Sequence, residues 1–196
     1  MAKNLEDRVK ELEKEVAALK AKAVLKLNKA LGIGDTFQLI DVEWKILDIT
    51  EQGYICLAET IGNKSFGSNN DWKESSIRKY LNGEFYEKLA EKIGADNIIP
   101  FKRDLLSMDG QTEYGTCEDK VSIMNFDEYR KYRPLTPNAG YWWWLLTPDS
   151  TPCNDDSTWI RVVSPSGRIY DIGCNGNCGV RPFCIFSSSI FESEEE

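Results

Sequence analysis

The chain has 196 residues, of which 41% are hydrophobic, and a formal net charge of −8 at pH 7. That length allows one well-buried domain with an appendage, and the acidic balance argues against a nucleic-acid partner, because phosphate binding relies on clustered Lys and Arg. The sequence has no histidine, which excludes Ser-His-Asp and Cys-His catalysis and every zinc site that needs imidazole.

The N-terminal residues and the cysteines indicate the compartment in which the chain is made. The first residues, MAKNLEDRVKELEKE, are charged throughout and lack the apolar core of a secretory signal. No segment reaches the run of about 18 apolar residues that a membrane span needs, so we expect no membrane insertion. Six cysteines would allow three bridges, but without an export signal we expect mostly free thiols.

The first segment of the chain carries a coiled-coil repeat. Apolar residues recur at alternating steps of four and three, with Val or Ala at a and Leu at d. The residues of this seam are Leu5, Val9, Leu12, Val16, Leu19 and Ala23. We therefore predict a coiled-coil oligomerisation helix over residues 1–31.

Charged residues beside the seam indicate how the helices would pair. Arg8 at g would meet Glu13 at e of a parallel partner, and Glu15 would meet Lys20 in the same way. Both pairs have opposite charge, which favours a parallel, in-register homo-oligomer, a dimer or trimer, through residues 5–23. The alternatives are a single amphipathic helix packed on its own domain, or a helix that was added to the natural protein.

The globular part begins with predicted strands and continues with predicted helices. Alternating and short apolar runs predict strands at TFQLI, EWKILDI and YICLAET. Helical spacing then predicts two short helices with a break at Asn82 and Gly83. Residues 95–120 are predicted to be mainly irregular, followed by a strand at VSIM (121–124) and a short helix at FDEYRKYR (126–133).

The last part of this domain alternates short strands with polar runs. The predicted strands are 142–146, 159–163 and 180–186, and the polar runs expected at the surface are 149–157 and 170–178. From residue 141 to residue 186 there is no Lys, Glu, Gln or Met. A rigid aromatic scaffold that carries Asn, Asp, Ser, Gly and Tyr is typical of a recognition surface, and not of a hydrolytic or redox centre.

The order of strands, helices, a loop-rich middle and further strands predicts an α+β domain over residues 34–186. Its N-terminal and C-terminal strands are expected to pair. Residues 187–196 are expected to form an acidic, solvated tail.

Four motifs occur in order within this domain: WKESSIRKYLN (72–82), KVSIM (120–124), WWWLLTP (142–148) and GVRP (179–182). Together they resemble a family of bacterial and phage lectin-fold domains, and within it the variable proteins of diversity-generating retroelements. The resemblance covers essentially the whole globular domain. It implies a C-type lectin fold that binds a protein or cell-surface receptor without a cofactor, on a chain made in the bacterial cytoplasm and assembled into a phage particle.

In that family a retroelement copies a template repeat into the end of the gene and mutates adenines. Asparagine codons then become codons for many residue types, but not for Lys, Glu, Gln, Met or Trp. Residues 153–158 and 170–178 contain only types that this process reaches. The resemblance thus implies a variable, ligand-binding set: Cys153, Asn154, Asp155, Asp156, Thr158, Tyr170, Asp171, Ile172, Cys174, Asn175 and Asn177. The alternative is that these are ordinary polar loops.

Four tryptophans and one arginine are assigned to the scaffold. Alternation places Trp142 and Trp144 on one face of their strand and Trp143 on the other, and we expect buried core on both faces rather than a sugar-stacking platform. Trp159 cannot arise from a mutated asparagine codon. We expect Arg181 to make a structural ion pair or backbone hydrogen bonds.

Three alternatives to a diversified binder are a metal site, an assembly module and an enzyme. Asn154, Asp155 and Asp156 offer oxygen ligands for calcium, but three neighbours do not make a coordination cage, and Cys174 with Cys178 lacks a second pair for zinc, so no metal is expected. A lectin-fold module that only mediates assembly would leave the polar runs inert. Formylglycine-generating enzymes share the lectin fold, but their pair of active-site cysteines does not map onto this sequence, so no enzymatic activity is expected.

Overall fold

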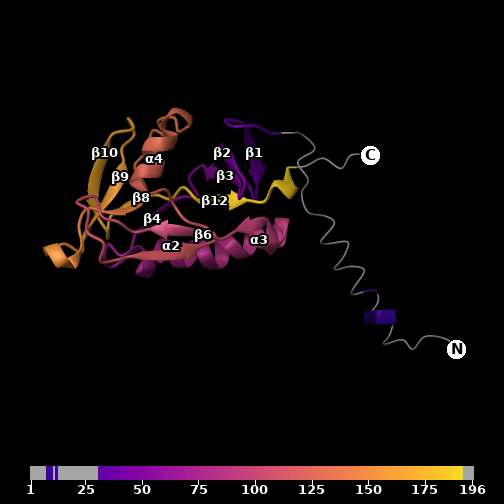
Figure 1. Cartoon of the computed structure of the whole chain (residues 1–196), viewed down its shortest axis with the longest axis horizontal. Coiled ribbons are helices and arrows are strands. Elements are labelled where there is room, and N and C mark those ends of the chain that lie inside the picture. Colours follow the sequence, from indigo (N-terminus) through magenta and orange to yellow (C-terminus); the bar gives the residue numbers. More distant parts are fainter. Residues whose placement is uncertain (1–7, 11, 13–30, 192–196) are drawn as a thin grey trace.

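The structure, a computed structural model, describes residues 8–10, 12 and 31–191 (Figure 1). Most of the predicted coiled coil over residues 1–31 lies outside the described residues, so it stays a prediction. The described head combines two five-stranded sheets and one two-stranded sheet with a few short helices. This composition confirms the α+β class. The described residues contain no helix that is both long enough and apolar enough to cross a membrane.

The first five-stranded sheet, sheet A, brings the two ends of the head together. Its strand order is β1-β2-β3-β12-β5, and all neighbours are antiparallel. Its strands are β1 (Thr36–Leu39), β2 (Val42–Thr50), β3 (Gly53–Ala58), β5 (Ile98–Ile99) and β12 (Phe183–Phe186). Because β12 lies between β3 and β5, the predicted pairing of the terminal strands is confirmed.

The second five-stranded sheet, sheet B, has the order β10-β9-β8-β11-β4. Only β8 and β11 are parallel within it. Its strands are β4 (Asn63–Ser65), β8 (Trp143–Pro148), β9 (Trp159–Val163), β10 (Ile169–Gly173) and β11 (Asn177–Gly179). The second polar run was expected to be a surface segment, but its first residues belong to β10. Gly167, at a φ of 81°, closes the tight turn that folds β10 back onto β9.

The prediction of an irregular segment over 95–120 is wrong. Strands β6 (Phe101–Asp104) and β7 (Thr116–Asp119) form an antiparallel pair there. The alternating apolar pattern of a strand is missing from the sequence of β6, because one of its two buried positions holds Arg103, which is 1% exposed. The predicted strand at 121–124 is also absent. That segment is buried, but it makes a single bridge, from Ser122 to β12.

The helices are short and lie along two sides of the sheets (Figure 1). They are α2 (Ser76–Tyr80), α3 (Tyr86–Ile93) and α4 (Phe126–Tyr132). A π-helical turn, η2 (Leu81–Phe85), joins α2 to α3, and Gly83 within it is non-helical, which confirms the predicted break. The 3-10 helices are η1 (Trp72–Glu74), η3 (Ala95–Asn97), η4 (Arg133–Leu135), η5 (Pro152–Asn154) and η6 (Ser188–Ile190).

Strand β8 of sheet B contributes side chains to both hydrophobic cores. Trp144 and Leu146 belong to the core that also contains residues of α2 and α3. Trp143 and Leu145 face the other side, in the core that contains residues of α4. A strand covered on both faces has to be apolar at every position, which accounts for the continuous run of large side chains in this part of the sequence.

The head extends beyond its predicted C-terminal boundary at residue 186. Ile190 and Phe191 are 1% and 3% exposed and belong to the core. The ring of Phe191 stacks on Tyr54, with 4.1 Å between ring centroids. The predicted tail over 187–196 therefore begins with residues that pack on the domain.

Candidate binding surface

The two polar runs predicted to bind a ligand lie side by side at one end of sheet B, the orange end of the head in Figure 1. Strands β9 and β10 pair so that Trp159 lies opposite Gly173. Just beyond this pair, the amide of Cys174 donates to the carbonyl oxygen of Thr158 at 2.7 Å. The fold thus makes neighbours of two runs that are separated in the sequence.

Most of the predicted ligand-binding residues are exposed. The exposed members are Cys153, Asn154, Asp155, Thr158, Tyr170, Asp171, Asn175 and Asn177, while Asp156 and Ile172 are half-buried. We call residues 153–158, 170–173 and 175–177 the loop surface. Tyr170 and Asp171 are consecutive in a strand and point to opposite faces, so the loop surface wraps around the edge of sheet B instead of lying on one face.

Cys174 does not belong on this surface. Its side chain is 4% exposed and packs in the core beside α2 and α3. The chain turns inward there because the carbonyl oxygen of Cys174 accepts hydrogen bonds from the amide of Gly67 and the hydroxyl of Ser65, both at 3.1 Å. Its assignment to the ligand-binding set is therefore wrong, since a ligand at the surface cannot reach the thiol.

The four scaffold tryptophans divide into two buried and two exposed residues. Trp143 and Trp144 are 1% and 0% exposed, as expected for core. Trp142 was also expected in the core but is 38% exposed, because its neighbour on that side is Tyr170 of the edge strand, itself 44% exposed. Trp159 is 46% exposed, since its cross-strand neighbour is a glycine with no side chain to cover it.

The exposed rings of Trp142 and Tyr170 meet edge to face, with 5.3 Å between their centroids. This arrangement fixes both rings at little conformational cost. The pair forms an aromatic patch beside the loop surface. Sequence reasoning missed it, because it assigned Trp142 to the core and only Tyr170 to the surface.

Arg161 connects the two runs on the opposite face of β10. Its guanidinium forms an ion pair with Asp149, at the start of the first run, and lies 3.5 Å from the carboxylate of Asp171. Arg161 and Asp171 are also cross-strand partners. Because both acids are partly exposed, the pairs contribute little stability and mainly fix the relative position of the runs.

Asn70 is buried under the first run and forms hydrogen bonds to both of its ends. Its side chain is fully buried, and its Nδ2 donates to the carbonyl oxygens of Ser150 and Trp159 at 3.1 and 3.3 Å. Its backbone N–H donates to the carbonyl oxygen of Ser157 at 2.8 Å, and its Oδ1 accepts from the Tyr114 hydroxyl. One residue thus ties down both ends of the run. Asn70 was not predicted, because an isolated asparagine in a polar stretch gives no periodic signal.

The segment over residues 105–115 supports the same run from the side. Asp109 accepts hydrogen bonds from the Ser150 hydroxyl at 2.6 Å and from the Asn154 amide at 3.2 Å. The carboxylate of Glu113 accepts from the backbone amide of Cys153 at 3.0 Å. The candidate surface therefore rests on a third segment that the sequence did not connect with it.

Acidification is expected to loosen this support. Hydrogen bonds from the hydroxyls of Ser107 and Ser150, and from Asn154, hold the pKa of Asp109 below its ordinary value. A carboxyl group with a lowered folded-state pKa stabilises the folded loop fully above the ordinary aspartate pKa of about 4, and that contribution is lost as the pH falls through the lowered pKa. We expect the protection of the amides at residues 150–154 against hydrogen exchange, relative to the intrinsic rate at each pH, to fall below that range, before the head unfolds.

Asp109→Asn provides the control for this prediction. The variant cannot titrate at this position, so the protection of residues 150–154, relative to the intrinsic rate at each pH, should already be reduced at neutral pH and should change little on acidification. An equally steep pH dependence in the variant would show that another group is responsible.

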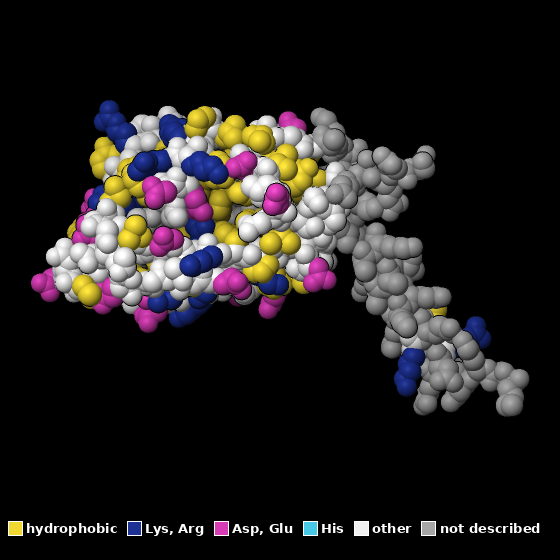
Figure 2. Space-filling model, viewed as in Figure 1, with side chains coloured by type: hydrophobic (Ala, Val, Ile, Leu, Met, Phe, Trp, Pro, Cys, Tyr) yellow, Lys and Arg dark blue, Asp and Glu magenta, His cyan; other side chains and the backbone are white. Residues whose placement is uncertain are grey.

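The surroundings of the loop surface are acidic. Burial raises the pKa of the Tyr114 hydroxyl first, and the nearby carboxylates of Asp71, Glu113, Asp156 and Glu74 raise it further. Figure 2 shows acidic side chains at this end of the head. A surface of this charge does not favour phosphate groups.

The cysteine thiols of the chain are unpaired, and none is activated. All six are free. The pKa of Cys153 is raised chiefly by a hydrogen bond to Glu113, and burial raises the pKa of the other five: Cys56, Cys117, Cys174, Cys178 (to about 11) and Cys184. Thiols with raised pKa values are poor nucleophiles at neutral pH. Within the described residues, no group of three or more His, Cys, Asp or Glu side chains is placed to hold a metal ion.

Arg181 lies away from the loop surface, behind β8. It is 3% exposed, and its guanidinium donates to the carbonyl oxygen of Ala58 and to the carboxylate of Glu59, both at 3.0 Å. It also lies over the ring of Trp143 at 5.2 Å. These are the ion pair and backbone bond expected of a scaffold residue.

Two overlapping segments of the chain, residues 52–121 and 101–188, match the family described as Domain of unknown function (DUF6273). Together they cover more than half of the chain and include the whole loop surface, Asn70 and the supporting segment. Comparison with curated proteins and with solved structures found no match.

Proposed function

This chain belongs to the DUF6273 family, and we propose that its head is a ligand-binding module whose contact residues are diversified by a retroelement. The observation that carries the proposal is that two runs made of diversifiable residue types lie side by side and largely exposed. Asn70, Asp109 and Arg161 hold these runs mainly through backbone groups or through side chains outside the loop surface, with the contacts to Asn154 and Asp171 as the two exceptions. Such a surface can change its side chains while keeping its shape.

The proposed mechanism is surface complementarity with a protein or cell-surface receptor. The aromatic patch of Trp142 and Tyr170 would supply rigid contact area, and the exposed Asn and Asp side chains would supply hydrogen bonds. We further propose that the head has a C-type lectin fold, which the α+β class supports at a coarser level. A coiled coil through residues 5–23 would present several heads together and raise avidity, as on a phage particle.

The sequence suggests two other functions. An enzyme of the formylglycine-generating type would work through reactive thiols, and the raised pKa values of all six cysteines do not favour that chemistry. A purely structural assembly module could use the same exposed aromatic patch for subunit contacts, so the two functions differ in whether the polar runs vary.

Population sequencing of codons 141–186 tests the proposal. Substitutions should concentrate at exposed loop-surface positions, with Asn154, Tyr170 and Asn177 among the most variable. Trp143 and Trp144 should be invariant, and Cys174 should vary little, because most replacements of a buried thiol would cost stability.

The same data discriminate the assembly module from a diversified binder. Sparse substitutions spread evenly over strands and loops would remove the retroelement from the proposal. A nearby template repeat that differs at adenines would then also be absent from the surrounding DNA.

A further inference from the structure

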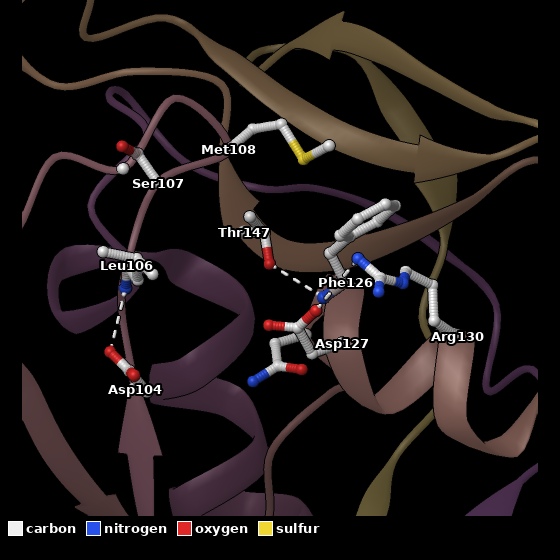
Figure 3. Close-up of a pocket in the computed structure, with 10 residues that line it drawn as sticks. Asp104, Leu106, Ser107, Met108, Phe126, Asp127, Arg130 and Thr147 are labelled. Carbon is white, nitrogen blue, oxygen red and sulfur yellow. Dashed lines mark hydrogen bonds and ion pairs between the residues drawn. The ribbon is translucent and has the colours of Figure 1, made fainter.

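A hollow of about 210 Å³ lies between the loop after β6 and the first turn of α4 (Figure 3). The side chains of Leu106, Met108 and Phe126 form its apolar wall, and the carboxylates of Asp104 and Asp127 lie on the side opposite Met108. Leu106 and Met108 are each 41% exposed, so the apolar wall is open to solvent. The hollow therefore combines an apolar side with an acidic side.

Backbone hydrogen bonds fix the walls of the hollow. The amide of Met108 donates to the carbonyl oxygen of Pro148 at 2.9 Å, and the amide of Leu106 donates to the carboxylate of Asp104 at 3.1 Å. Phe126 is held by its amide, which donates to the Thr147 hydroxyl at 2.9 Å. A hollow whose walls are already ordered binds a ligand without a large entropic cost of closing.

The polar groups of the hollow do not suit an anion. Two of the first three amides of α4 already have partners, since Phe126 donates to Thr147 and Glu128 donates to the Asn125 side chain at 2.7 Å. Among the lining residues only Arg130 is a cation. Its side chain is 66% exposed, lies over the Phe126 ring at 5.2 Å and approaches Asp127 at 3.4 Å. An exposed pair of this kind is weak and can be exchanged for another cation.

We propose that this hollow binds a lysine side chain presented by a partner protein. The four methylene groups of lysine would lie against Leu106, Met108 and Phe126, and its ammonium group would face Asp104 and Asp127. Lysine suits the site because it pairs a long apolar stem with a compact charge at its end. The proposal does not depend on diversification of the loop surface, because none of these residues belongs to that surface.

The methionine methyl groups allow a direct test by NMR. The chain has three methionines: Met108 lines the hollow, Met124 is fully buried, and Met1 is the first residue. In full-length protein labelled at the methionine methyl, Nα-acetyl-lysine N-methylamide is titrated at constant ionic strength. We expect a saturable shift of the Met108 signal with a Kd on the order of millimolar, while the Met124 signal stays in place.

The norleucine analogue is the matched probe, because it has nearly the same apolar stem without the ammonium group. Its affinity should be about two- to fivefold lower, the range measured for exposed ion pairs. No saturable shift of Met108, or equal affinity for both probes, overturns the proposal.

Two variants test the charges separately. Asp104→Asn keeps an oxygen that can accept from the Leu106 amide, and together with Asp127→Asn it should abolish the preference for lysine over norleucine. Arg130→Gln removes the competing cation, so lysine should bind more tightly while norleucine is unaffected. A lysine preference that survives loss of both carboxylates contradicts the proposal. An unchanged Met124 signal reports that each variant is folded. Because the hollow lies outside the loop surface, the population sequencing test can fail while lysine still binds, so the two proposals are tested independently.

Discussion

Trp144→Ala is expected to destabilise the head by about 4 kcal/mol, the range found for a fully buried tryptophan. The side chain is 0% exposed. Its ring packs edge to face against Phe66, with 5.7 Å between centroids, and its Nε1 donates to the carbonyl oxygen of Lys64 at 2.8 Å. The substitution would leave a cavity between β8 and the helices and would leave that carbonyl oxygen without its partner. Urea unfolding followed by circular dichroism measures the loss.

Trp142→Ala is the control for this prediction. It removes the same type of side chain two residues earlier, from a position that is 38% exposed. We expect a loss of about 1 kcal/mol or less, because surface substitutions away from buried networks have small effects. If both variants lost the same stability, the division of this tryptophan run into core and surface would be wrong.

Asn70→Ala is expected to cost about 3 kcal/mol and to release the first run of the loop surface. Alanine would leave the carbonyl oxygen of Ser150 and the hydroxyl of Tyr114 without the Asn70 side chain, and each unsatisfied buried group costs about 1–3 kcal/mol. The carbonyl oxygen of Trp159 would lose one of its two hydrogen bonds and keep the one from the amide of Asp149. Hydrogen exchange should therefore rise across residues 150–159 at denaturant concentrations where sheet A is still protected.

Asn69→Ala is the matched control at the neighbouring position. The Asn69 side chain bonds only to the backbone amide of Asp71 and the carboxylate of Glu74, at the surface. Its loss should cost less than about 1 kcal/mol and leave residues 150–159 protected. Equal exchange in both variants would show that the run does not depend on Asn70.

The parts of the fold that the sequence predicted well are those with a strong periodic signal. Strands β2 and β3, the break at Gly83 and the buried pair Trp143 and Trp144 all follow from spacing and from the residue type at a turn. The capped helix α4 follows from its own segment in the same way. These elements need no knowledge of distant neighbours.

The errors occur where a distant neighbour decides the outcome. Trp142 is exposed because its neighbour is an edge strand, and Cys174 is buried because the amide of Gly67, in the turn before α2, donates to its carbonyl oxygen. Arg103 is buried within β6 because Glu128 forms an ion pair with it at 2.5 Å and two phenylalanine rings flank it. A single sequence contains no signal for such pairings.

The candidate surface also combines features that follow from the local sequence with features that depend on distant neighbours. Its residues could be proposed from composition, but the groups that support it could not. Asn70 and Asp109 act through hydrogen bonds to segments far along the chain, and these contacts exist only once β8 and β9 have paired.

The position of β12 has a consequence for protein synthesis. This strand is the last that the structure describes, yet it lies inside sheet A, between β3 and β5. Sheet A therefore cannot be completed until the segment after the loop surface has left the ribosome. A stop codon or frameshift within codons 153–178 would remove β12 and leave two strand edges exposed to proteolysis and aggregation. If those codons are diversified, the fold itself selects for an intact reading frame, because only chains translated to their end can close the sheet.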